Sequence, residues 1–224
     1  MGLQTRRNVT GHDGARPGAP RVPYRRSALM QDRLADNRAR IMRATRQLIA
    51  RGGFRCARIA AVAAAAGLST GSIYRYFPSQ AQLFIEVLTA AVSHEIELLE
   101  SISAAQGAAA VRLKNAVESF ARRALEGRNL AYAFIAEPIG AQVDVARMRS
   151  RREFCQVFQR LLAAGVRSGE FPPQDVEVGA ACIVGAFTEA LVGPIAPGSK
   201  AVTPRARARL IAAISRFCVR AVRP

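Results

Sequence analysis

Tryptophan is absent from this 224-residue sequence, and histidine and cysteine are scarce. The four cysteines stand far apart without a C-x-x-C pair, and only His12 and His94 could add imidazole ligands. Neither the spacing of a zinc site nor a dense disulfide framework is present. We therefore expect no metal and no cofactor.

Long hydrophobic runs are also missing. The longest uncharged apolar stretch lies between Glu177 and Glu189, well short of the roughly 18 residues that indicate a membrane span. The first residues, which include Arg6 and Arg7, lack the apolar centre of a secretory signal. We expect a soluble, cytoplasmic protein with no membrane partner.

Acidic residues are few, with 16 against 33 basic residues and a formal net charge of +17. All of the basic residues except Lys114 and Lys200 are arginine. Arginine suits forked contacts to phosphate or carboxylate, although the composition of the genome would produce the same bias. The excess of positive charge favours a negatively charged partner.

The positive charge is concentrated in the first third of the chain. Residues 1–33 have a net charge of +5, and residues 34–80 hold eight arginines and one acid. Residues 81–224 have a net charge of only +5. This distribution favours a nucleic-acid partner for the early segment, whereas a solvated arginine-rich surface without a partner is the alternative.

Hydrophobic residues make up 50% of the chain, which is typical of a globular protein. They recur at three and four positions after residue 33, so the sequence predicts an all-α fold. We divide it into a disordered basic tail (1–33), an arginine-rich helical domain (34–80) and a larger helical domain (81–224). The expected helices cover residues 36–51, 59–66, 70–77, 80–104, 109–126, 128–137, 141–168, 174–193 and 204–221.

Residues 59–77 have the pattern of a helix-turn-helix, in which a short helix, a turn containing Gly67 and a second short helix follow one another. Ser69 can cap the second helix. Its inward positions are Ile73 and Phe77, so Gly71, Ser72, Tyr74 and Arg75 point outward. The alternative is an ordinary helical hairpin in which Tyr74 and Tyr76 are packed inside.

The stretch from Arg38 to Leu88 resembles the DNA-binding domain of the tetracycline-repressor (TetR) family. The resemblance rests on Gly53-Phe54, on Ala66-Gly67-Leu68-Ser69, and on the ordered run from Gly71 to Phe77. It implies a three-helix DNA-binding domain whose third helix enters the major groove of a near-palindromic double-stranded operator. It also implies a repressor that a small-molecule effector releases from DNA.

The same resemblance assigns DNA contacts to residues of the third helix. Arg75 is added to these contacts because its position points outward. The family usually has a lysine and a threonine where this chain has Gln80 and Ala57. Each change removes a phosphate contact or a cap, for which the nearby Arg55 and Arg58 could substitute. The expected DNA-binding residues are Arg58, Thr70, Gly71, Ser72, Tyr74, Arg75 and Tyr76.

The carboxy-terminal domain is predicted to bind the effector between its helices. The expected ligand-binding residues are mostly aromatic, with one carboxylate: Phe120, Tyr132, Phe134, Glu137, Phe154 and Phe158. A plain hydrophobic core is the alternative for each aromatic residue.

A homodimer is expected because one short reading helix covers too few base pairs for useful specificity. We place its interface on the last two helices, at Ile183, Phe187, Ile211 and Ile214.

Two other function classes compete with a DNA-binding regulator. A basic helical protein could bind membrane surfaces through the basic tail and an amphipathic helix. An enzyme is less well supported, because the sequence has no G-x-S-x-G motif, no glycine-rich phosphate loop and only isolated histidines.

Overall fold

The computed structural model describes Gly2 and residues 28–223, and within these residues it contains helices and no strand. The predicted basic tail therefore lies largely outside the described residues. The helices are α1 (Ala28–Gly52), η1 (Phe54–Cys56), α2 (Ile59–Ala66), α3 (Thr70–Tyr74), α4 (Gln80–Ser103), α5 (Ala109–Glu126), α6 (Arg128–Ile135), α7 (Ala141–Arg167), α8 (Val176–Ile195) and α9 (Pro204–Ala221).

Several helix boundaries differ from the sequence prediction, most of them by one or two residues; three of the differences have a physical reason. Helix α1 begins at Ala28 instead of residue 36, in a run of good helix formers without glycine or proline. Helix α3 ends at Tyr74 because the chain turns before Phe77. Helix α8 continues past the predicted stop at residue 193 to Ile195, with Pro194 in its last turn. The carbonyl that Pro194 leaves unbonded belongs to Ala190, which is exposed to solvent.

The amino-terminal domain packs α1, α2 and α3 around a core that includes Ile41, Val62 and Phe77, all fully buried. The first turns of α4 belong to the same core through Leu83 and Phe84. The core thus extends beyond residue 80, where the sequence analysis ended this domain.

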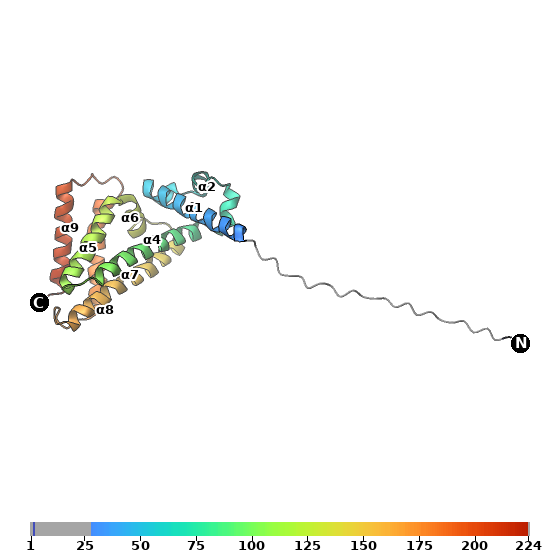
Figure 1. Ribbon diagram of the computed structural model, residues 1–224. Coiled ribbons are helices and arrows are strands. Elements are labelled where there is room, and N and C mark those ends of the chain that lie inside the picture. The colour runs from blue at the N-terminus through green and yellow to red at the C-terminus, as the bar shows by residue number, and fades with distance from the viewer. Residues whose placement is uncertain (1, 3–27, 224) are drawn as a thin grey trace.

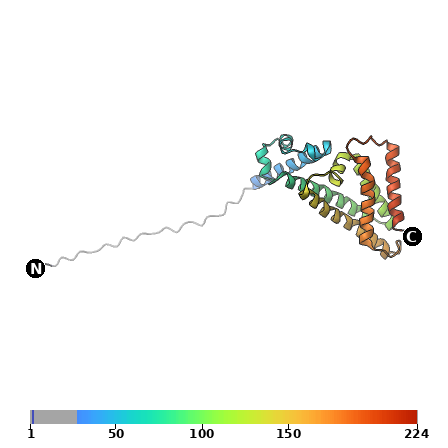
Figure 2. The same ribbon diagram turned by 180° about the vertical axis from the view of Figure 1, so that it is seen from behind.

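The second core lies in the carboxy-terminal domain, between α5, α7, α8 and α9. Helices α4 and α7 run side by side from the first domain into the second (Figure 1). Helices α8 and α9 pack together at the end remote from α2 and α3 (Figure 2). This arrangement separates the helix-turn-helix from the last two helices.

Helix α8 is the one helix among residues 28–223 that is long and apolar enough to cross a membrane. Its Ile183, Val184, Phe187 and Leu191 are buried in the second core. Only about a third of the apolar segment is buried within the chain. Packing in the core therefore accounts for the apolar residues on one face of α8 and not for those on its other faces.

Candidate nucleic-acid interface and ligand pocket

The helix-turn-helix is fixed by local hydrogen bonds. Gly67 ends α2 in the left-handed conformation at φ 63°, which glycine adopts without a steric penalty. The Ser69 hydroxyl then accepts a hydrogen bond from the backbone N–H of Ser72 at 3.2 Å. With Ile73 and Phe77 fully buried, α3 has a defined outward face.

That outward face carries most of the predicted DNA contacts. Thr70, Gly71 and Arg75 are exposed, and the Tyr74 side chain is 51% exposed. A Cβ added at Gly71 would meet no atom within 4 Å. Ser72 is partly buried, and its hydroxyl lies 2.8 Å from that of Ser69. The alternative with Tyr74 packed inside does not agree with this placement.

Tyr76 and Arg58 lie in different surroundings. Tyr76 is partly buried, and its hydroxyl oxygen accepts a hydrogen bond from Asn37 Nδ2 of α1 at 3.0 Å. Arg58 is exposed where α2 begins. Gln80 donates to the carbonyl of the buried Ala57 at 3.2 Å, so this pair supports the domain internally.

A pocket of about 340 Å³ lies in the carboxy-terminal domain. Residues of α4, α5, α6, α7 and α8 line it, and Arg46 reaches it from α1 of the amino-terminal domain. Its apolar lining includes Leu88, Phe120, Leu130, Phe134, Phe154 and Val184. The pocket therefore joins both domains.

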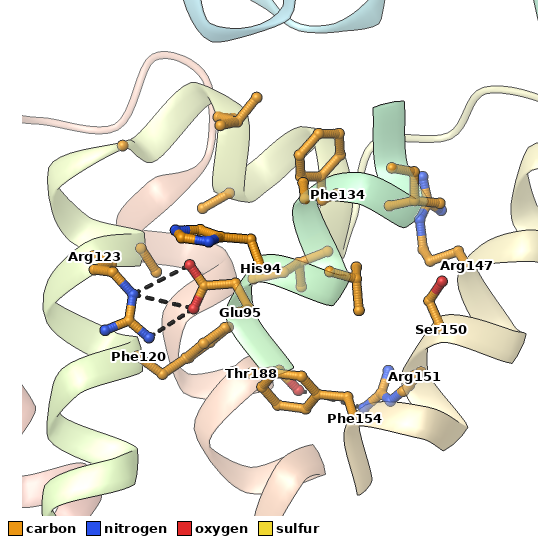
Figure 3. Close-up of a pocket in the computed structure, with 18 of the residues that line it drawn as sticks. His94, Glu95, Phe120, Arg123, Phe134, Arg147, Ser150, Arg151, Phe154 and Thr188 are labelled. Atoms are coloured by element: carbon orange, nitrogen blue, oxygen red, sulfur yellow. Dashed lines mark hydrogen bonds and ion pairs between the residues drawn. The ribbon is translucent and has the colours of Figure 1, made fainter. Parts of the chain in front are cut away.

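Charged groups stand on two sides of this pocket (Figure 3). On one side, Arg123 forms hydrogen bonds with both carboxylate oxygens of Glu95, at 2.6 to 3.1 Å. On the other, Arg147, Ser150 and Arg151 stand along α7. Arginine side chains outnumber carboxylates in the lining, because Glu95 is its one acidic member.

Half of the predicted ligand residues line this pocket. Phe120, Phe134 and Phe154 do so, whereas Tyr132, Glu137 and Phe158 do not. Phe158 is 1% exposed and packs behind Phe154, with ring centroids 5.7 Å apart. Tyr132 packs against the second core. Glu137 instead accepts a hydrogen bond from the backbone N–H of Phe54 at 3.0 Å, and so contacts the amino-terminal domain.

The four residues predicted for the dimer interface lie inside a single chain. Ile183, Phe187, Ile211 and Ile214 are between 0% and 8% exposed and belong to the second core. The reason is that the bundle buries the most apolar stripe of each helix against its own neighbours. The exposed large apolar residues of α8 and α9 are Val178 and Phe217.

Several pocket residues were not predicted, notably Arg46, Arg147, Ser150, Arg151 and Thr188. Helical periodicity could have suggested the α7 members, since they precede Phe154 by three to seven positions. No local pattern could have suggested Arg46, which lies in the other domain. Only the packing of α1 beside α6 brings it to the pocket.

Comparison with known proteins supports the arrangement. Residues 41–87 match the family model described as bacterial regulatory proteins, tetR family. The transcriptional repressor KstR of Mycobacterium tuberculosis is 28% identical over 147 residues, which cover 60% of this chain and 66% of that protein. KstR of Rhodococcus jostii is 36% identical over 80 residues, or 34% of this chain and 36% of that protein. The chain thus spans from about a third to just under two thirds of these relatives.

Solved structures share the fold over most of the chain. The regulator FadR from Bacillus subtilis, in complex with stearoyl-CoA, has a TM-score of 0.70 at 19% identity and covers 82% of this chain and 98% of its own. RolR in complex with resorcinol has a TM-score of 0.62 at 23% identity, covering 87% and 97%. The family match over the helix-turn-helix and the similarity to the KstR repressors thus support a regulator of the tetR family, and the solved structures show that the fold is shared.

Proposed function

We propose that the protein is a DNA-binding transcriptional repressor whose affinity for its operator falls when a small molecule occupies the pocket. The observation that carries the proposal is the position of Arg46, which belongs to α1 of the DNA-binding domain and lines the pocket of the other domain. A ligand there would contact both domains directly. A cytoplasmic location accompanies this proposal.

The DNA-binding part of the proposal is supported by exposure and charge. Thr70, Gly71 and Tyr74 are exposed on one short helix whose opposite side is buried, and the exposed Arg75 follows directly after that helix. Hydroxyl, aromatic and guanidinium groups can donate to phosphates and contact base edges. Residues 34–80 hold eight arginines against a single acid, which supplies the sequence-independent attraction to DNA.

Hydrogen bonds at both ends of α6 support transmission from the pocket to the DNA-binding domain. Asn129 at the start of α6 donates to the carbonyls of Ala50 and Arg51 at the end of α1, both at 3.1 Å. Beyond the other end of α6, Glu137 accepts from Phe54. Phe134, between these two contacts, lines the pocket. A ligand that displaces α6 would therefore move the end of α1, which packs against α2.

We further propose a homodimer formed by the outward faces of α8 and α9. Val178 and Phe217 are 57% and 61% exposed on these helices. The exposed acid Glu189 lies on α8, whereas the exposed Arg216 and Arg220 flank Phe217 on α9. Opposite charges on the two helices suit a two-fold arrangement in which α8 of one copy meets α9 of the other.

The test begins with selection of genomic DNA fragments on the purified protein, followed by titration of the recovered sequence. We expect a near-palindromic site, bound far more tightly than scrambled DNA of equal length. Small molecules that raise the melting temperature are then added to the complex. An inducer must bind better to the DNA-free state, and we expect operator affinity to fall by about 5- to 150-fold.

Two controls make this experiment decisive. Arg167→Ala removes an exposed arginine at the end of α7 and should leave operator binding unchanged. By linkage, operator DNA must weaken binding of the same ligand by the same factor. Failure to recover any preferred sequence would refute the regulator, whereas pocket ligands that leave operator affinity unchanged would refute only the control by ligand.

A further inference from the structure

We infer that the pocket takes an amphipathic anion, with an apolar body enclosed by the domain and a carboxylate or equivalent anionic group held near Arg151. The inference deepens the proposed function, because it names the chemical class of the effector. It rests on the graded polarity of the lining, on the pairing of its charges, and on a guanidinium nitrogen of Arg147 that is buried without a partner among the described residues.

Polarity changes with depth in this pocket. The buried part of the lining is mainly apolar and includes Leu88, Phe154 and Val184. The exposed part includes Arg46, His94 and Arg151, together with the apolar Met148. A ligand seated here would therefore bury its apolar end and present its polar end to cationic side chains at the mouth.

The ion pairs of the pocket lining leave some of its arginines without a carboxylate partner among the described residues, so part of the lining is positively charged. Glu95 is engaged by Arg123, and Arg147 forms an ion pair with Asp144 at 2.8 Å. Within residues 28–223, no carboxylate lies at ion-pair distance from Arg46 or Arg151. Arg151 donates a hydrogen bond to the neutral Thr188 hydroxyl at 3.3 Å. Its guanidinium can therefore still bind an anion in forked geometry.

A buried hydroxyl strengthens the same side. Ser150 is 5% exposed and lines the pocket beside Arg151, where its hydroxyl can donate a hydrogen bond to a ligand. The Nε atom of Arg147, another lining residue, is buried without a hydrogen-bond partner in the described part of the chain. Buried polar groups are normally satisfied. An anionic group between Arg147, Ser150 and Arg151 (Figure 3) would supply acceptors to them.

The experiment uses the full chain without DNA and matched ligands that differ only in their head group. An n-octyl chain and a naphthalene ring are each offered as carboxylate, alcohol and amine, and affinities are measured by calorimetry. We expect at least one carboxylate to bind about tenfold or more tightly than its alcohol, as a charge-assisted hydrogen bond implies, and the amine to bind most weakly.

Variants assign the preference to the proposed residues. Arg151→Gln should reduce the advantage of the carboxylate over the alcohol to about threefold or less while leaving alcohol binding unchanged. Arg46→Gln should weaken carboxylate binding in the same direction. Arg152→Gln, a change at the next residue of α7, which is exposed and outside the lining, is the matched control and should behave as the parent. Thermal melting checks that each variant folds.

Equal affinity for the three head groups, tighter binding of the amine, or failure of every carboxylate to bind at millimolar concentration would overturn the inference. So would an Arg151→Gln variant that keeps the full preference. Operator titration then separates the two proposals. A carboxylate that depends on Arg151 but leaves operator affinity unchanged refutes the regulation and leaves the ligand class standing. An uncharged molecule that lowers operator affinity would refute the anionic ligand class and leave the regulation standing.

Discussion

The carboxylate of Glu137 and the backbone N–H of Phe54, 83 positions apart in sequence, form a 3.0 Å hydrogen bond that joins the two domains. Arg147 fixes the backbone beside this contact, because its Nη2 donates to the Glu137 carbonyl at 2.6 Å. Arg147 also lines the pocket. Two hydrogen bonds in series, from Arg147 to Glu137 and from Phe54 to Glu137, thus connect the pocket with the DNA-binding domain.

Gly53, which precedes Phe54, should be intolerant of any side chain. Its φ is +77°, and an added Cβ would lie 2.5 Å from Oε2 of Glu137. We expect Gly53→Ala to lower the free energy of unfolding by about 1–3 kcal/mol, from strain and from displacement of the carboxylate. Urea denaturation measures the change.

Gly198 is the matched control for this substitution. Its φ is +79°, and an added Cβ would meet no atom within 4 Å, so Gly198→Ala should incur the backbone strain alone. Equal losses of stability in the two variants would contradict a specific role for the Glu137 contact.

Substitutions on α3 and α2 should separate base reading from charge attraction. Tyr74→Ala should weaken operator binding by about 1–3 kcal/mol and leave binding to scrambled DNA nearly unchanged. Arg58→Ala should weaken binding to both DNAs and reduce the salt slope by about one. Fluorescence anisotropy over a range of salt concentrations measures both effects. A Tyr74→Ala protein with the parent's operator affinity would show that α3 does not read the site.

A charge at Phe217 should prevent dimerisation, because its ring is 61% exposed on the face of α9 that we propose for the contact. Phe217→Asp should shift the protein from dimer to monomer in light scattering at micromolar concentration. Val145 is 64% exposed on α7, and Val145→Asp serves as the control that leaves assembly intact. If the Phe217→Asp and Val145→Asp proteins both have the molar mass of the parent dimer, the interface does not include Phe217.

Glu170 should contribute to stability in a pH-dependent way. Hydrogen bonds from the backbone N–H groups at the start of α5, first of all that of Ala109 at 2.8 Å, hold the pKa of Glu170 below its usual range. A carboxyl whose folded pKa is lowered stabilises the fold above its unfolded pKa of about 4.3. That contribution is lost as pH falls through the folded value.

The measurement is a series of thermal melts from neutral to acidic pH. Glu170→Gln should lower the melting temperature at neutral pH and flatten the decline of stability in acid. Glu126→Gln, at an exposed residue at the end of α5, is the control and should follow the parent. Identical acid profiles for the Glu170→Gln protein and the parent would rule out this role.

Local chemistry made the helix-turn-helix predictable from sequence. Gly67 ends α2, the Ser69 hydroxyl caps α3, and the Ser79 hydroxyl caps α4 by accepting from the N–H of Gln82 at 3.1 Å. Each of these two capping bonds joins residues three positions apart. The inward position of Ile73 and the outward position of Tyr74 follow from helical periodicity, and the structure agrees with both.

Tertiary packing decided which side chains form the pocket and which face of each late helix is free. The residue type of Phe187 or Phe158 is equally compatible with a hydrophobic core, a ligand site and a protein interface. The angle at which its helix meets its neighbours selects one of these, and both residues became core. Arg46 entered the pocket because α1 packs against α6. Sequence thus determined what short-range hydrogen bonds and helical period control, while contacts between distant helices depend on how the whole bundle closes.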